Sequence, residues 1–177
     1  MSNIKGELRE NMRRLRDSLP KSYRDLACET VAEEFAANWG CYDSFALYSP
    51  IGSEVDTAPL LKTLSGKDIL YPKVFGGELV WGKGELIVGY AGIREPVLLV
   101  DYRPQAVVAP CLAFDKDNYR LGYGKGYYDR FLAKFPDIFS VAIAFACQEV
   151  DTVFPEPHDV RVAAVLTDKK LLSVKNK

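Results

Sequence analysis

This chain of 177 residues contains a single histidine, His158. Catalysis with a histidine as general base would depend on His158, and nothing beside it resembles a nucleophile. The four cysteines form no Cys-x-x-Cys pair, which together with the single histidine argues against a zinc site. Free thiols in a reducing compartment account for the cysteines, so we expect a cytoplasmic protein.

Long apolar runs and an excess of charge are also lacking. No apolar stretch approaches 18 residues, so no membrane span is expected, and the basic N-terminus has no apolar core typical of a signal peptide. The net charge of −1 argues against non-specific binding of nucleic acid. We therefore expect neither a membrane nor a nucleic acid as partner. The length predicts a single domain over residues 1–177, and we expect a monomer.

Short apolar segments alternate with helical patterns along most of the chain. Helices are predicted over residues 4–17, from Pro20 to about Gly40, and over 126–134, and Leu8, Met12 and Leu15 share one face of the first helix. Strands are predicted at 45–48, 68–71, 106–109, 141–145 and 163–166. Glycines between 76 and 95 separate strand-like pieces at 79–81 and 86–88, which indicates an antiparallel excursion of hairpins. The whole pattern favours an α/β fold with a largely parallel sheet covered by helices on both faces.

Three alternating glycines give the sequence its most informative segment. Gly122, Gly124 and Gly126 stand among the cations Arg120 and Lys125, between an apolar run and a helical segment. Glycine tolerates positive φ, so such a backbone can turn its N–H groups into an anion cradle, and a helix that starts there adds positive potential. The spacing fits neither a Walker A loop nor G-x-G-x-x-G, and taken alone it suits a flexible hairpin equally well.

The residues after the loop favour a polyphosphate site. Tyr127 and Tyr128 offer aromatic surfaces, and Asp129 offers a carboxylate for Mg²⁺ at the start of a helix. The surrounding sequence contains Pro110, then Ala113-Phe114-Asp115, then Arg120-Leu121-Gly122-Tyr123-Gly124-Lys125-Gly126-Tyr127-Tyr128-Asp129. This long pattern closely resembles the 5-formyltetrahydrofolate cyclo-ligase (5,10-methenyltetrahydrofolate synthetase) family, and the resemblance extends along essentially the whole chain.

The resemblance implies a three-layer α/β fold of the kind shared with ribose-phosphate isomerase-like and CoA-transferase-like proteins. It also implies ATP- and Mg²⁺-dependent cyclisation of 5-formyltetrahydrofolate, with or without a polyglutamate tail, to 5,10-methenyltetrahydrofolate. In such a reaction the formyl oxygen is phosphorylated, and ADP and phosphate are released. Two alternatives remain open: a paralogue that uses the same nucleotide site on another substrate, and a non-catalytic nucleotide- or RNA-binding module that stacks bases on its tyrosines.

Site residues follow from the resemblance. The ATP-binding set is Lys5, Arg9, Arg120, Leu121, Gly122, Tyr123, Gly124, Lys125, Gly126, Tyr127 and Tyr128. The other sets are Lys125, Tyr127 and Arg120 for catalysis, Ser49, Glu54, Tyr123 and Tyr127 for the folate, and Asp129 for the metal. By spacing alone, Lys5 and Arg9 share a helical face that is typical of solvated surface, and only the resemblance assigns them to phosphates.

The chain departs from the family pattern at four positions. Tyr123 stands where some members have arginine, and Cys111 and Asn118 stand where glycine is frequent. Ala163 aligns with a second Mg²⁺-binding aspartate of some members, and Asp168 lies too far along the chain to replace it. If this alignment holds, Asp129 carries the metal together with waters and phosphates.

Overall fold

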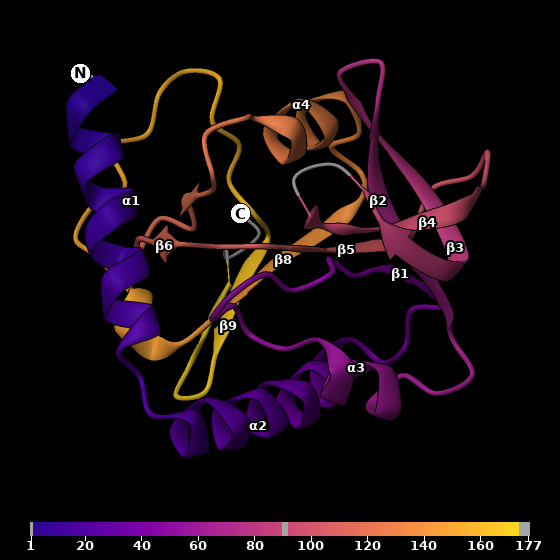
Figure 1. Ribbon diagram of the computed structural model, residues 1–177, viewed down its shortest axis with the longest axis horizontal. Helices are drawn as coiled ribbons and strands as arrows, with labels where there is room; N and C mark the ends of the chain where they lie inside the picture. The colour runs from indigo at the N-terminus through magenta and orange to yellow at the C-terminus, as the bar shows by residue number, and fades with distance from the viewer. Residues whose placement is uncertain (1, 90–91, 174–177) are drawn as a thin grey trace.

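The computed structural model describes residues 2–89 and 92–173 (Figure 1). The helices are α1 (Ser2–Asp17), α2 (Lys21–Trp39), α3 (Ala58–Thr63), α4 (Tyr127–Lys134) and the 3₁₀ turn η2 (Ala146–Gln148). The strands are β1 (Ser44–Ala46), β2 (Asp68–Phe75), β3 (Glu78–Val88), β4 (Arg94–Leu99), β5 (Ala106–Ala109), β6 (Ala113–Phe114), β7 (Arg120–Leu121), β8 (Phe139–Ala144), β9 (Ala164–Thr167) and β10 (Leu171–Ser173). None of the helices in these described ranges is long and apolar enough to cross a bilayer.

One sheet of eight strands organises the molecule, in the order β10-β9-β8-β5-β1-β2-β3-β4. The five strands from β9 to β2 are parallel, whereas β10 at one end and β3 and β4 at the other are antiparallel. The α/β class and the antiparallel excursion are thus confirmed. The two pieces expected at 79–81 and 86–88 are a single strand, β3, because the glycines produce a register shift between Lys83 and Leu86 rather than a turn.

Helices cover both faces of the sheet, as the three-layer prediction requires (Figure 1). On one face, α2 and α3 bury residues such as Phe35 and Leu60 against Phe45 and other strand residues. On the opposite face, α4 buries Phe131, whose ring lies 5.0 Å from that of Trp81 on β3. The apolar stripes of the helices therefore fix the sheet between two layers.

Helix α1 lies apart from these layers, beside the small hairpin of β6 and β7 (Figure 1). Met12 is buried there in a third cluster with Ala113, Leu121 and Val153, and Leu8 packs against that cluster. The expectation that Leu15 continues this stripe is wrong, because its side chain is 41% exposed. Arg16 faces inward instead, since it forms buried hydrogen bonds with other segments.

Candidate active site

A cavity of about 550 Å³ lies where the strand order reverses. The chain proceeds from β1 to β2 on one side and returns to β5 on the other, so the loops after β1 and β5 leave the sheet in different directions. Ser49, which follows β1, and Pro110, which follows β5, both line the cavity. Ligands of open α/β sheets bind beyond the carboxyl ends of the strands at such a reversal.

The glycine loop (residues 122–126) forms one wall of this cavity. It follows the β6–β7 hairpin, in which Asn118 adopts a φ of 61°. Asparagine is among the few side chains that tolerate this conformation, which explains how it replaces glycine there. Gly124 has a φ of +91°, and Gly126 has a φ of +66° and is the N-cap of α4. The loop thus opens directly onto a helix N-terminus, as the anion-cradle hypothesis predicts.

Arg120 brings a buried positive charge to the base of the loop, with a side chain that is 3% exposed. Its Nη2 lies 3.4 Å from Asp129 Oδ1, and its guanidinium lies 5.4 Å from the centre of the Tyr128 ring. Its Nε is buried without a hydrogen-bond partner in the described part of the chain. A buried guanidinium with an unpaired N–H donor can form a charge-assisted hydrogen bond with an anion.

Asp129 has one carboxylate oxygen committed and one available. Its Oδ1 accepts hydrogen bonds from the Val160 N–H at 3.2 Å and from Arg120. Its Oδ2 accepts none from the residues that the structure describes. Mg²⁺ is often bound through one or two carboxylates together with phosphate oxygens and waters, so Asp129 fits as a single protein ligand.

Helix α1 supplies two further cations to the cavity. Arg9 donates from Nε to the Gly122 carbonyl at 2.9 Å, which fixes the start of the glycine loop. Lys5 lies 2.7 Å from both Glu156 and Asp159. Burial disfavours the charged ammonium, but hydrogen bonds to these two carboxylates outweigh that effect and raise the pKa of Lys5. Any phosphate that Lys5 contacts must therefore compete with two carboxylates.

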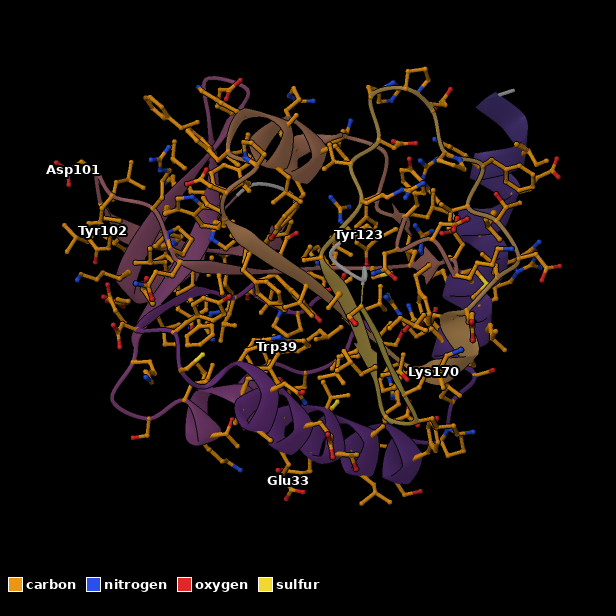
Figure 2. All side chains as sticks on the ribbon, turned by 180° about the vertical axis from the view of Figure 1, so that it is seen from behind. Glu33, Trp39, Asp101, Tyr102, Tyr123 and Lys170 are labelled. Atoms are coloured by element: carbon orange, nitrogen blue, oxygen red, sulfur yellow. The ribbon has the colours of Figure 1, made fainter. Side chains whose placement is uncertain are left out.

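A buried polar network crosses the opposite side of the cavity. Tyr123 donates from its hydroxyl to Glu54 Oε1 at 2.6 Å, and Arg16 donates to the same hydroxyl at 3.3 Å. The second Glu54 oxygen accepts the Ile51 N–H at 2.8 Å. Burial raises the pKa of Glu54, although the Tyr123 hydroxyl, the Ile51 N–H and Arg16 each act to lower it. Figure 2 shows Tyr123 near the middle of the molecule, whereas Glu33 and Asp101 lie at its edge.

Known proteins share this architecture. Residues 1–168 match the model of the 5-formyltetrahydrofolate cyclo-ligase family. The chain belongs to this family. It is 31% identical, over 94% of each chain, to the 5-formyltetrahydrofolate cyclo-ligase of Mycolicibacterium smegmatis.

Two solved structures of cyclo-ligase relatives are also similar. The 5,10-methenyltetrahydrofolate synthetase of Aquifex aeolicus gives a TM-score of 0.83 at 31% identity, covering 98% of this chain and 94% of that one. The synthetase of Mycoplasma pneumoniae gives a TM-score of 0.78 at 27% identity, covering 93% and 98%. The fold and the family are therefore established together.

All the site residues that the cyclo-ligase resemblance suggested line the same cavity. They come from three separate parts of the chain: Lys5 and Arg9, Ser49 and Glu54, and the continuous segment of residues 120–129, which contains the glycine loop. The structure brings them together, and their individual roles remain predictions. Ala163 does not line the cavity, and Asp168 accepts hydrogen bonds from Tyr23 and the Ala146 N–H instead. Neither position adds a carboxylate beside Asp129.

Several cavity residues escaped the sequence analysis. Glu156, His158 and Asp159 line it from a loop without regular structure, and Glu95 lines it from β4. The acidic ligands of Lys5 had no signal in the sequence, because they lie about 150 positions away from it. Arg16 had a detectable signal, since it stands one turn beyond Met12 on the same helix face.

Proposed function

We propose that the protein catalyses the ATP- and Mg²⁺-dependent cyclisation of 5-formyltetrahydrofolate to 5,10-methenyltetrahydrofolate, with release of ADP and phosphate. The observation that carries this proposal is the cavity at the strand reversal. The glycine loop and buried Arg120 form one side of it, and the carboxylate of Glu54 lies on another side. Membership of the cyclo-ligase family supports the same reaction.

The reaction needs activation of a poor electrophile. The oxygen of a formamide is a weak leaving group, so attack by the neighbouring N10 amine alone would not expel it. Attack of the formyl oxygen on the γ-phosphorus of ATP releases ADP and converts that oxygen into a phosphate ester. N10 then bonds to the formyl carbon, phosphate leaves with the oxygen, and the N10 proton is lost. The protein has to align the reactants and stabilise charge on the transferring group.

The residues near the glycine loop are suited to the phosphates. We assign Lys125, Arg120 and the N–H groups of residues 122–126 to binding the polyphosphate. Arg9 would hold the loop in place through its hydrogen bond to the Gly122 carbonyl. Arg120 already lies at the base of the loop with an unpaired donor, so little reorganisation is needed when negative charge develops. Lys5 joins them when the phosphates displace Glu156 and Asp159.

The other side of the cavity is suited to the folate. Ser49 and Glu54 lie on the loop after β1, and Tyr123 and Tyr127 face the same space from the glycine loop and α4. Asp129 would hold Mg²⁺ through its available oxygen. When bound, Mg²⁺ would neutralise charge on the β- and γ-phosphates during transfer.

The proposed function is tested by the absorbance of methenyltetrahydrofolate formed from 5-formyltetrahydrofolate, with and without MgATP. A rise that requires both ATP and Mg²⁺, with one ADP per product, is expected. ATP binding without any rise would point to a paralogue with another substrate. Absence of both would refute the nucleotide site itself.

Replacing Lys125 with alanine is expected to reduce ATP-dependent turnover about 10- to 100-fold, because a charge-assisted hydrogen bond contributes roughly 1.5–3 kcal/mol. Lys125 is exposed and lines the cavity, so its removal should leave the fold intact. Steady-state kinetics with ATP as the varied substrate measure the effect. Lys134→Ala, at the end of the helix that follows the loop and outside the cavity, is the control. Unchanged ATP kinetics in folded Lys125→Ala protein would remove this residue from the proposed site.

Replacing Tyr123 with phenylalanine is expected to shift the acid limb of kcat/KM for the folate to higher pH. The hydroxyl of Tyr123 donates to Glu54 and lowers the pKa of that carboxyl, so its loss lets burial raise this pKa further. The ionised form of Glu54 is then lost at a higher pH as the pH falls. A pH–rate profile measures the shift. An acid limb identical to that of the wild type would show that Glu54 does not act as a carboxylate.

A further inference from the structure

The cavity has a second end that the phosphate site does not use. Its wall there is formed by β2 and by the antiparallel strands next to it, with Pro72 and Val74 from β2 and Leu79 from β3. Ile93 adds a further apolar side chain just before β4, and Glu95 adds a carboxylate from β4 itself. This end therefore combines an apolar surface with one acidic group, which suits a flat ring system that carries N–H donors on one edge.

Glu95 is a buried carboxylate whose hydrogen-bonding capacity is unused. Its side chain is 10% exposed, and its nearest cation, Lys73, lies 3.8 Å from it, beyond hydrogen-bonding distance. No residue in the described ranges donates a hydrogen bond to its carboxylate. Buried carboxylates normally accept several hydrogen bonds, because their desolvation is otherwise costly. The vacant acceptors of Glu95 thus lie in a cavity wall where a ligand can reach them.

The backbone around Glu95 makes room for this carboxylate. Gly89 lies directly beside it, and a Cβ at that position would come within 2.8 Å of the Glu95 Cγ and closer still to the carboxyl group. Only glycine therefore lets the glutamate keep its position. A side chain held in this way is preorganised for recognition.

Glu54 is not equivalent to Glu95. Both of its oxygens already accept hydrogen bonds, one from the Tyr123 hydroxyl and the other from the Ile51 N–H. A ligand edge with two parallel donors would have to displace at least one of them. Glu95 can accept both donors without such a loss.

We propose that Glu95 determines specificity for the pterin ring of the folate by accepting hydrogen bonds from its 2-amino group and N3–H. These two donors lie side by side on one edge of the ring and match the two oxygens of a carboxylate. The faces of the ring would lie against the apolar wall formed by Pro72, Val74 and Leu79. This inference rests on the proposed function, because it concerns the same substrate.

The test is equilibrium binding of 5-formyltetrahydrofolate, without ATP, to the wild type and to Glu95→Gln. The amide substitution is expected to weaken binding by a factor of about 10 to 100, because one donor then faces an N–H₂ group. ATP affinity should not change. The thermal midpoint of the variant should equal or exceed that of the wild type, since the removed charge is buried, accepts no hydrogen bond from the described residues and has Lys73 only at 3.8 Å. If Glu95 had only a structural role, its replacement would weaken folate binding only together with a loss of thermal stability.

A folate analogue in which a methyl group replaces the 2-amino group makes the test specific. The wild type should bind the analogue more weakly than the parent folate, whereas Glu95→Gln should discriminate little between the two. Glu85→Gln, an exposed glutamate on the neighbouring strand β3, should behave as the wild type does. Equal folate affinities for wild type and Glu95→Gln, or an undiminished penalty for the analogue in the variant, would overturn the assignment. A wild type that binds no 5-formyltetrahydrofolate would overturn the proposed function itself.

Discussion

Replacing Arg120 with glutamine is expected to lower kcat for methenyltetrahydrofolate formation by about 100- to 1,000-fold, the usual cost of removing a preorganised donor from a transition state. Arg120 is 3% exposed, and its Nε has no partner within the described residues. One donor of this guanidinium is therefore uncommitted although another faces Asp129, and no other arginine or lysine that lines the cavity is as deeply buried. Single-turnover kinetics at saturating ATP and folate measure the loss in the chemical step.

The stability of this variant needs a control, because breaking a buried ion pair costs about 3–5 kcal/mol. Among the residues that the structure describes, Asp129 would keep the Val160 N–H as its one hydrogen-bond donor. Arg120→Lys retains the charge without the planar fork, and we expect it to fold and to recover only part of the activity. A folded Arg120→Lys protein with wild-type kcat would show that any cation suffices here. A folded Arg120→Gln protein with wild-type kcat would exclude Arg120 from the reaction.

Replacing Gly124 with alanine is expected to weaken ATP binding by about 100-fold or more. The φ of +91° at this position places a Cβ 3.2 Å from the Arg9 guanidinium carbon, so alanine strains the backbone and also presses on Arg9. The strain costs roughly 1–2 kcal/mol. Displacement of Arg9 from the Gly122 carbonyl costs roughly 1.5–3 kcal/mol more. Calorimetric titration with an ATP analogue that is not hydrolysed measures the affinity.

Gly66→Ala is the matched control for backbone strain. Gly66 has a φ of +86°, close to that of Gly124, but it stands in open space between α3 and β2, away from the cavity. We expect its replacement to lower the free energy of unfolding by about 1–2 kcal/mol and to leave ATP binding unchanged. If both alanine variants bound ATP equally well, the special geometry of the glycine loop would have no functional meaning.

The central strands and the helices were predictable because each has a strong local pattern. The continuous apolar run of β5 and the apolar stripe of α2 both consist of residues that are buried in the structure. Apolar residue types at a regular spacing predict such burial directly from the sequence. Strand β10 was missed because it is mostly exposed and short, so its pairing with β9 depends on a turn rather than on hydrophobicity. The β6–β7 hairpin was missed for a similar reason, since two-residue strands have no period.

The site was predictable where its residues follow one another in the sequence, and much less so where they do not. The glycine loop is contiguous, so its spacing and its resemblance to the cyclo-ligases identify it directly. Glu95 has no such neighbours, because it reaches the cavity from β4, whose place depends on its pairing with β3. The partners of Lys5 and of Arg16 depend likewise on how α1 lies against distant loops. Tertiary contacts of this kind have no local signature.

Helix α1 joins the rest of the protein largely through the same side chains that face the site. Lys5 binds the loop at residues 156–159, Arg9 binds the glycine loop, and Arg16 binds Ser53 and Tyr123. Its buried apolar side chain in the described part of the chain is Met12, which belongs to one small cluster. A nucleotide that bridges α1 and the glycine loop would therefore stabilise the docked helix by mass action, by about 2.7 kcal/mol at a ligand concentration of 100 Kd. In that case, local opening of the helix and release of the nucleotide would be one coupled equilibrium.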